Sequence, residues 1–201
     1  MLDGATRRLI GPVLDRLGSG LARSGITADS VTYAGFALGL AAALAIATKL
    51  YALGLALILL SRLCDGLDGA VARHTAKTDR GGFLDIVLDF AFYGVIPLAF
   101  VIADPAANAI AGATLIVSFY VNGASFLAFA IFAEKRKLAT EARGSKSLYF
   151  TTGLAEATET IALFCLFCLF PSAFVPLAYV FAALTFATAA ARIVMAVQTF
   201  R

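Results

Sequence analysis

Six long apolar stretches constrain this chain more than any other feature. They lie near residues 31–48, 50–67, 83–103, 109–132, 148–170 and 173–197. A helix that crosses a bilayer needs about 20 apolar residues, so six crossings use about 120 residues. Little of the 201-residue chain then remains for a separate soluble domain. Charged residues make up only 14 % of the chain, against roughly a quarter in a soluble domain. We therefore predict an all-α integral membrane protein with six transmembrane helices.

The segment before the first stretch has the pattern of a helix that lies on a membrane. Its apolar residues recur at helical spacing, with charged residues between them: Val13, Leu14, Leu17 and Leu21, and Arg8, Asp15, Arg16 and Arg23. A basic amphipathic helix suits the headgroup region, although such a helix also packs on other protein segments. We expect Gly25 to end it and Thr27 with Asp29 to begin the next helix. The predicted division is a juxtamembrane amphipathic segment at 1–26 and a six-helix domain at 27–201.

The basic residues predict how the chain sits in the membrane. Of the 16 Lys and Arg, only Lys49 falls in the loops that the six helices place on one side. The others lie before the first helix, around the two longer connections and toward the end of the last helix. The positive-inside rule then places both termini and these connections in the cytoplasm. We expect a multi-pass protein of the cytoplasmic (inner) membrane.

Four aspartates interrupt the apolar pattern between residues 61 and 90. Asp65 and Asp68 are three residues apart, and Asp85 and Asp89 are four apart, so each pair lies on one helical face. A short connection makes the two helices antiparallel neighbours, and all four carboxylates can converge. Such a cluster is costly unless cations neutralise it, and oxygen ligands favour Mg²⁺, Mn²⁺ or Ca²⁺. Pairing with Lys and Arg of the loop is the alternative.

Small residues beside the carboxylates leave space for a phosphate or a nucleotide ring to approach: Gly66, Gly69, Ala72, Gly81 and Gly82. Arg62 and Arg73 are too few to balance four acids and are candidates to bind a phosphate. These features together suggest phosphoryl-group chemistry. Two cations would bridge a pyrophosphate and orient an in-line attack, and one carboxylate would accept the proton of the incoming nucleophile. The predicted site lies at the cytoplasmic interface.

The pattern Asp65-x-x-Asp68-Gly69-x-x-Ala72-Arg73, seven residues, then Gly81-x-x-x-Asp85-x-x-x-Asp89 resembles the signature of the CDP-alcohol phosphatidyltransferases. That family also has six membrane helices preceded by a surface helix. The segment 25–27 resembles the turn that opens its first membrane helix, although Ala28 and Asp29 replace the usual proline and asparagine.

The resemblance implies transfer of a phosphatidyl group from CDP-diacylglycerol to a small alcohol, with release of CMP. It also implies that Asp65, Asp68 and Asp85 are ligands of two Mg²⁺ or Mn²⁺ ions. Asp89 would lie beside the metals as the base that deprotonates the acceptor. Gly69, Ala72, Gly81 and Arg73 are then nucleotide-binding residues. The implied partners are CDP-diacylglycerol, the alcohol, membrane lipids and a second copy of the chain, and no nucleic acid.

The sequence leaves the acceptor open between two chemistries. Arg143 and Lys146 suit an acceptor that carries a phosphate, although they also fit ordinary loop charge. Glu156 and Glu159 lie three apart inside the fifth apolar stretch, where a carboxylate indicates function by default. They suit an acceptor with an amine or quaternary ammonium, or they pair with Arg143, Lys146 or Arg192.

Three other functions compete with this interpretation. A prenyltransferase that binds Mg²⁺-pyrophosphate also uses membrane aspartates, but such proteins are longer and space their acids differently. A divalent-cation transporter also uses convergent carboxylates, but its sites favour the midplane and repeated halves, and no internal repeat is visible here. A scaffold that has lost its chemistry is the third alternative, and the complete set of acids argues against it.

Overall fold

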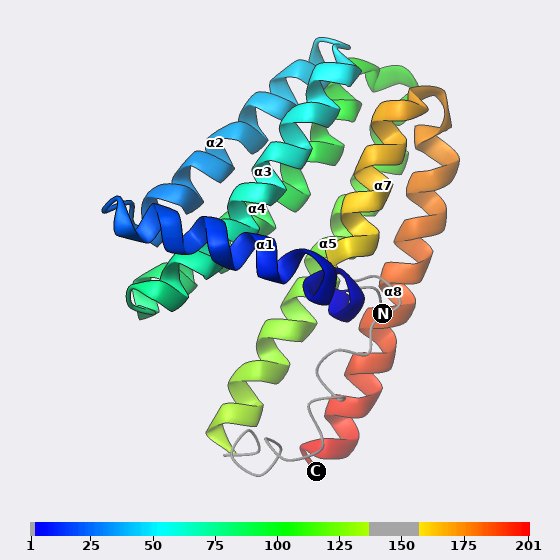
Figure 1. Ribbon diagram of the computed structural model, residues 1–201. Helices are drawn as coiled ribbons and strands as arrows, with labels where there is room; N and C mark the ends of the chain where they lie inside the picture. The colour runs from blue at the N-terminus through cyan, green and yellow to red at the C-terminus, as the bar shows by residue number, and fades with distance from the viewer. Residues whose placement is uncertain (1–2, 137–156) are drawn as a thin grey trace.

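In the computed structural model the described residues are 3–136 and 157–201, and within them the chain forms helices and no strand (Figure 1). The elements are α1 (Asp3–Arg23), α2 (Ala28–Ala47), α3 (Tyr51–His74), α4 (Asp79–Ala103), α5 (Pro105–Lys135), α7 (Ala157–Leu169), the short 3-10 helix η2 (Pro171–Ala173) and α8 (Phe174–Thr199). The predicted all-α fold is confirmed.

Local sequence explains where the helices near the site begin. Gly25 has a positive φ of 79° after α1, a conformation that glycine adopts without steric cost. Thr27 then caps α2, because its side chain accepts a hydrogen bond from the Ser30 amide. Thr78 caps α4 in the same way through the amide of Gly81. These two caps fix where α2 and α4 begin, and site residues lie further along both helices.

Within the part of the chain that the structure describes, four helical segments are long and apolar enough to cross a membrane: α2, α4, α5 and residues 171–199. Helix α3 has 24 residues, but from its middle onward it carries the charged residues Arg62, Asp65 and Asp68. Helix α7 is apolar but has 13 residues, and the predicted start of its stretch at residue 148 lies outside the described residues. The structure thus supports a multi-pass membrane protein with four candidate spans.

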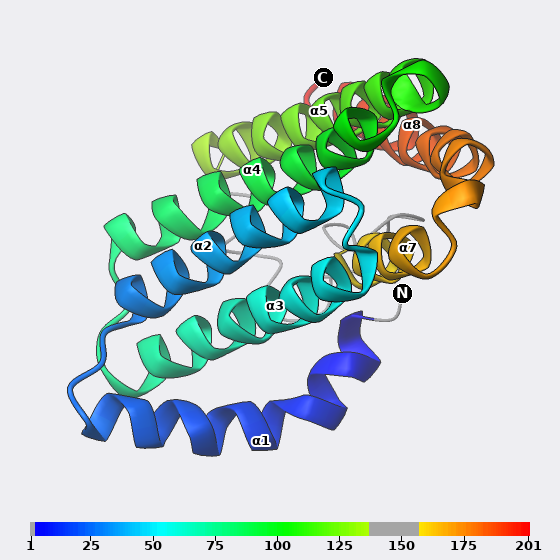
Figure 2. The same cartoon turned by 90° about the horizontal axis from the view of Figure 1, so that it is seen from above.

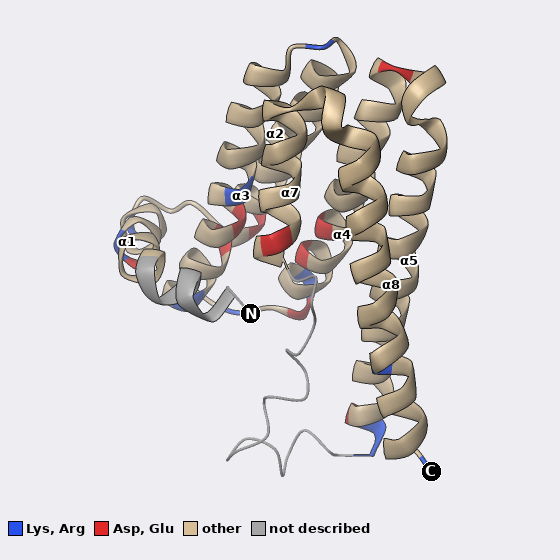
Figure 3. Cartoon of the chain, turned by 90° about the vertical axis from the view of Figure 1, so that its right-hand side faces the viewer, with Lys and Arg blue, Asp and Glu red and all other residues tan. Residues whose placement is uncertain are grey.

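The outer surface of these helices is apolar. Ile110 on α5 is 72 % exposed and Leu44 on α2 is 68 % exposed, and many other large apolar side chains are exposed with them. A water-soluble monomer rarely exposes so much apolar area. Charged residues gather instead toward the end of the bundle where α1 lies, as Figure 3 shows.

Helix α2 packs against both α3 and α4, while α5 pairs with α8 on the other side of the molecule from α1 (Figure 2). The close approach of α2 depends on two buried glycines. A Cβ on Gly35 would lie 2.9 Å from the Cβ of Cys64 on α3, and one on Gly39 would lie 2.7 Å from Cδ2 of Phe92 on α4. Small residues at this spacing allow helix backbones to approach.

Helix α1 runs across α3 and packs one face on it (Figure 1). A Cβ on Gly18 would lie 2.6 Å from the Cβ of Ala70, so the two backbones are in close contact there. Other apolar side chains of α1 stay exposed: Ile10, Val13 and Leu17 are 46 %, 57 % and 49 % exposed. The first segment therefore has both a protein-facing side and an exposed apolar side.

An aromatic cluster from α4, α7 and the start of α8 is part of the core, to which α2, α3 and α5 also contribute. Its rings are fully buried and pack at centroid distances near those of favourable aromatic pairs: Phe92, Phe100, Phe164, Phe167 and Phe174. The Phe100 and Phe174 rings stack at 5.2 Å, and the Phe92 and Phe164 rings meet edge-on at 6.0 Å. Phe92 lies at the end of this cluster that is nearest to the aspartates.

Candidate active site

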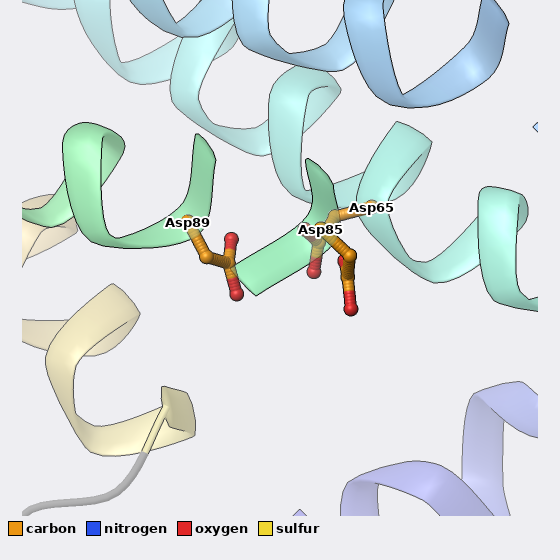
Figure 4. A group of neighbouring side chains, drawn as sticks. All are labelled: Asp65, Asp85 and Asp89. Atoms are coloured by element: carbon orange, nitrogen blue, oxygen red, sulfur yellow. The ribbon is translucent and has the colours of Figure 1, made fainter. Parts of the chain in front are cut away.

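Three of the four predicted aspartates converge. Asp65 projects from α3, and Asp85 and Asp89 project from successive turns of α4, with all three carboxylates pointing to the same side (Figure 4). One carboxylate oxygen of each lies within 4.8 Å of the others. The sequence prediction that spacing on two helices brings these acids together is confirmed for this group.

The fourth aspartate, Asp68, lines the same pocket but is more enclosed. It is 6 % exposed. Its Oδ2 accepts a hydrogen bond of 2.6 Å from the Thr32 hydroxyl on α2, and its Oδ1 accepts one of 2.6 Å from its neighbour's amide at Gly69. Two short hydrogen bonds to a buried carboxylate stabilise its charged form and fix its orientation. Asp68 is thus held in place by α2.

Arg62, on α3, extends its side chain toward the cluster of aspartate carboxylates. Its Nη1 lies 2.6 Å from Oδ1 of Asp89 and 3.2 Å from Oδ1 of Asp65. The contact to Asp89 links α3 to α4. The sequence suggested Arg62 as a partner for a phosphate, whereas the structure pairs it with two of the acids.

A small pocket joins these residues, and α2, α3 and α4 all contribute to its wall. Its lining residues are Thr32, Gly35, Phe36, Ser61, Arg62, Asp65, Asp68, Asp85, Leu88 and Asp89. All four predicted aspartates are among them. The pocket combines a dense set of carboxylate oxygens with the exposed side of Asp85, which connects it to the surface.

The predicted nucleotide-binding residues lie beside this pocket on the same two helices. Gly69 and Ala72 are partly buried on α3, and Gly81 lies in the first turn of α4. A Cβ on Gly81 would lie 3.1 Å from the Thr78 hydroxyl and 3.3 Å from a carboxylate oxygen of Asp29. Glycine therefore suits this position, because a side chain there presses on the cap of α4.

Arg73, the last of the predicted nucleotide-binding residues, is half exposed near the end of α3. Its Nε lies 3.3 Å from Oδ1 of Asp15 on α1, and Nε2 of His74 lies 3.4 Å from the same oxygen. This contact ties the end of α3 to α1. At such exposure the ion pair contributes little to stability, so Arg73 remains available to an anionic ligand.

Three of the four predicted acceptor-binding residues lie outside the described residues: Arg143, Lys146 and Glu156. Glu159 lies in the first turn of α7 and is partly buried. Arg192 on α8, a suggested partner of the glutamates, donates to Asn122 and Ser125 on α5, with 2.8 Å from its Nη1 to Asn122 Oδ1 and to Ser125 Oγ.

Sequence reasoning missed Thr32 and the pairing of Arg62. Thr32 is a hydroxyl-bearing residue near the start of an otherwise apolar stretch, one turn inside α2. Its polar side chain in this apolar stretch was the feature that could have marked it as a site residue. Arg62 lies three residues before Asp65, so the two share a helical face. An arginine within an apolar stretch and on the same face as an acid was the signal for this pair.

The donor set fits a hard divalent cation. Carboxylate oxygens are the preferred ligands of Mg²⁺ and Mn²⁺, and the structure gathers three of them within 4.8 Å. The arrangement can also accept a proton, because carboxylates near a bound hydroxyl act as general bases. Cation binding and proton acceptance are thus available within one pocket.

Comparisons with known proteins agree on one family. The family model of the CDP-alcohol phosphatidyltransferases matches residues 25–198. The chain is 46 % identical to inner membrane protein YnjF of Escherichia coli over 193 residues, which cover 96 % of this chain and 94 % of that protein. It is 40 % identical over 91 residues to the archaetidylinositol phosphate synthase of Methanothermobacter thermautotrophicus, covering 45 % of this chain and 43 % of the relative.

A solved structure shares the fold. The crystal structure of Mycobacterium tuberculosis phosphatidylinositol phosphate synthase with CDP-DAG bound has a TM-score of 0.58 to this chain. The two are 22 % identical, and the match covers 93 % of this chain and 91 % of that one.

Proposed function

The chain belongs to the CDP-alcohol phosphatidyltransferase family and is a phosphotransferase, and from this premise we propose that it moves a phosphatidyl group from CDP-diacylglycerol to a small alcohol. CMP is the second product. The observation that carries the proposal is the convergence of Asp65, Asp85 and Asp89 within 4.8 Å. This membership favours the transferase over the cation transporter and the prenyltransferase. The solved structure with the same fold has CDP-DAG bound, which supports this choice of donor.

The four aspartates of the pocket are proposed to hold two divalent cations, Mg²⁺ or Mn²⁺: Asp65, Asp68, Asp85 and Asp89. When bound, such cations neutralise the pyrophosphate and stabilise the charge that develops on the leaving group. The protein contributes the geometry: Thr32 and the amide of Gly69 orient Asp68, and Arg62 orients Asp89. A preorganised ligand set avoids the cost of rearranging charged side chains when the substrate arrives.

The proposed transfer is a single displacement at the phosphorus of the phosphatidyl group. The acceptor oxygen forms the new bond to this phosphorus, and the bond from phosphorus to the bridging oxygen of the pyrophosphate breaks. CMP leaves with that oxygen and its electron pair. Asp89 is the proposed catalytic residue and takes the proton of the acceptor hydroxyl as the new bond forms.

Gly69, Ala72, Arg73 and Gly81 are proposed to line the cytidine side of the substrate. The glycines and the alanine leave the backbone of α3 and α4 open beside the carboxylates, and Arg73 supplies a planar cation for a phosphate or a base. The contact of Arg73 with Asp15 is at the surface, so an incoming nucleotide can replace it at little cost.

We propose the following membrane arrangement. Helix α3 and the stretch that contains α7 join the four candidate spans, giving six. The exposed apolar side of α1 rests in the headgroup region, as segment 1–26, and residues 27–201 form the transferase domain. The gathering of Lys and Arg at the end where α1 lies (Figure 3) supports a cytoplasmic site in the inner membrane. The proposed assembly is a homodimer.

The test is CMP release by purified protein in detergent with CDP-diacylglycerol and Mg²⁺ or Mn²⁺, across a panel of alcohols. The panel holds glycerol 3-phosphate, inositol, inositol phosphate, serine, ethanolamine and choline. A phosphorylated acceptor supports the proposed roles of Arg143 and Lys146, and a cationic one supports Glu156 and Glu159.

Two variants on α4 sharpen this assay. Asp89→Asn is expected to slow CMP release by about 10²–10⁴-fold, the usual contribution of a general base. Asp79→Asn makes the same chemical change on the same helix but outside the pocket, and it is expected to leave the rate unchanged. A folded protein that releases no CMP with any alcohol and either metal, or an active Asp89→Asn variant, would contradict the proposal.

A further inference from the structure

Arg62 lies between carboxylates of two helices, although it falls outside the family signature that begins at Asp65. Its side chain is 10 % exposed. The same nitrogen, Nη1, contacts Asp89 on α4 at 2.6 Å and Asp65 on α3 at 3.2 Å. A guanidinium stays charged at all ordinary pH values. A fixed positive charge is therefore part of the acidic cluster.

The surroundings of Arg62 hold this charge in place. The guanidinium carbon lies 3.8 Å from the centre of the Phe92 ring, a cation–π contact. Its Nη2 donates to the Ser61 hydroxyl, which in turn donates to the carbonyl of Gly35 at 2.7 Å. The Nε atom is buried and has no hydrogen-bond partner within the described part of the chain. A side chain fixed on three sides cannot move aside into water at little cost.

The Arg62 guanidinium and a bound metal ion would neutralise the same carboxylates. The three convergent carboxylates lie within 4.8 Å of one another, and carboxylates this close repel one another when ionised unless a cation lies among them. Arg62 already supplies one cation to two of the three. A divalent cation that binds the same oxygens is repelled by the guanidinium and shares its ligands.

We propose that Arg62 is a built-in cation of the cluster, which holds Asp65 and Asp89 together without metal and weakens the binding of divalent cations. The inference rests on the proposed metal site and adds a positioning residue to it. Its consequence is a site that stays assembled when empty and releases its cations readily. Replacing Arg62 by a neutral side chain then tightens metal binding, an effect that a purely structural role does not produce.

The test measures Mn²⁺ binding to purified full-length protein from the electron paramagnetic resonance signal of free Mn²⁺. Arg62→Gln is expected to bind Mn²⁺ at least tenfold more tightly than wild type, or about 1.4 kcal/mol. Arg62→Lys keeps the charge and is expected to bind within about threefold of wild type. Arg80→Gln is the matched control, because Arg80 is 73 % exposed and pairs with Asp29 outside the cluster. Unchanged or weaker Mn²⁺ binding by Arg62→Gln would overturn the inference.

Thermal unfolding in a chelator gives a second readout. Arg62→Gln is expected to melt at a lower temperature than Arg62→Lys without metal, and Mn²⁺ is expected to remove this difference. The variant is purified with Mn²⁺, which is then withdrawn. Failure to fold even with Mn²⁺ present would overturn the inference, since Arg62 would then be needed for reasons other than charge. If wild type binds no Mn²⁺, the metal site and this inference both fall; if only the affinity change is missing, this inference falls alone.

Discussion

Thr32 controls the orientation of Asp68, and its removal offers a quantitative test of the site. The Thr32 hydroxyl donates to Asp68 Oδ2 at 2.6 Å, and Asp68 is 6 % exposed. Valine has nearly the same shape as threonine but cannot donate. Thr32→Val therefore removes this hydrogen bond and leaves the buried Asp68 carboxylate with the one that the amide of Gly69 donates.

A hydrogen bond to a charged group contributes about 1.5–3 kcal/mol. For a protein of this length, a change of 1 kcal/mol shifts the melting temperature by roughly 2–4 °C. We expect Thr32→Val to melt about 3–12 °C below wild type when both are measured with a chelator in detergent. CMP release by this variant is also expected to fall, because Asp68 is no longer held toward the pocket.

Thr32→Ser is the matched control, since it keeps the hydroxyl and loses one methyl group. It is expected to stay within about 1 kcal/mol of wild type in unfolding free energy, the cost of one buried methylene. The reasoning is refuted if Thr32→Val and Thr32→Ser melt together, or if Thr32→Val keeps the full rate of CMP release. Either result means that the 2.6 Å contact does not hold Asp68.

Three further predictions concern packing, a helix end and the metals. Gly35→Ala is expected to lower the unfolding free energy by about 1–3 kcal/mol, since its Cβ meets Cys64, whereas Gly94→Ala has open space and is expected to be neutral or stabilising; equal melting temperatures would contradict this. Arg136→Gln removes the 2.6 Å contact to the carbonyl of Phe200, and we expect faster amide hydrogen exchange at the end of α8, with unchanged exchange as the opposing result. A chelator is expected to abolish CMP release and added Mn²⁺ to restore it; persistence of the activity in the chelator would refute the metal requirement.

The sequence predicts the helices well where the apolar run and the helix coincide. The first stretch, expected at 31–48, corresponds to α2 at Ala28–Ala47, and the last, expected at 173–197, corresponds to α8 at Phe174–Thr199. The second stretch was expected to end at residue 67, but α3 continues to His74. Hydropathy reports only the apolar part of a helix, and α3 carries on through the polar residues of the signature.

The site divides in the same way between local and long-range information. Helical spacing alone places Asp85 and Asp89 on one face, and a short connection brings Asp65 toward them. Thr32 comes from α2, a third helix, so its contact with Asp68 depends on how α2 packs on α3. That packing is set by buried glycines and cannot be read from the signature.

Phe92 belongs to two parts of the molecule at once. One side of its ring meets Phe164 in the aromatic core, and the guanidinium of Arg62 lies over its face. Changes of side-chain volume deep among the core rings therefore reach the carboxylates through a single aromatic ring. Substitutions at Phe164, remote from the carboxylates, are expected to alter metal affinity as well as stability. In this protein, a change in core packing is therefore also a change in the electrostatics of the site.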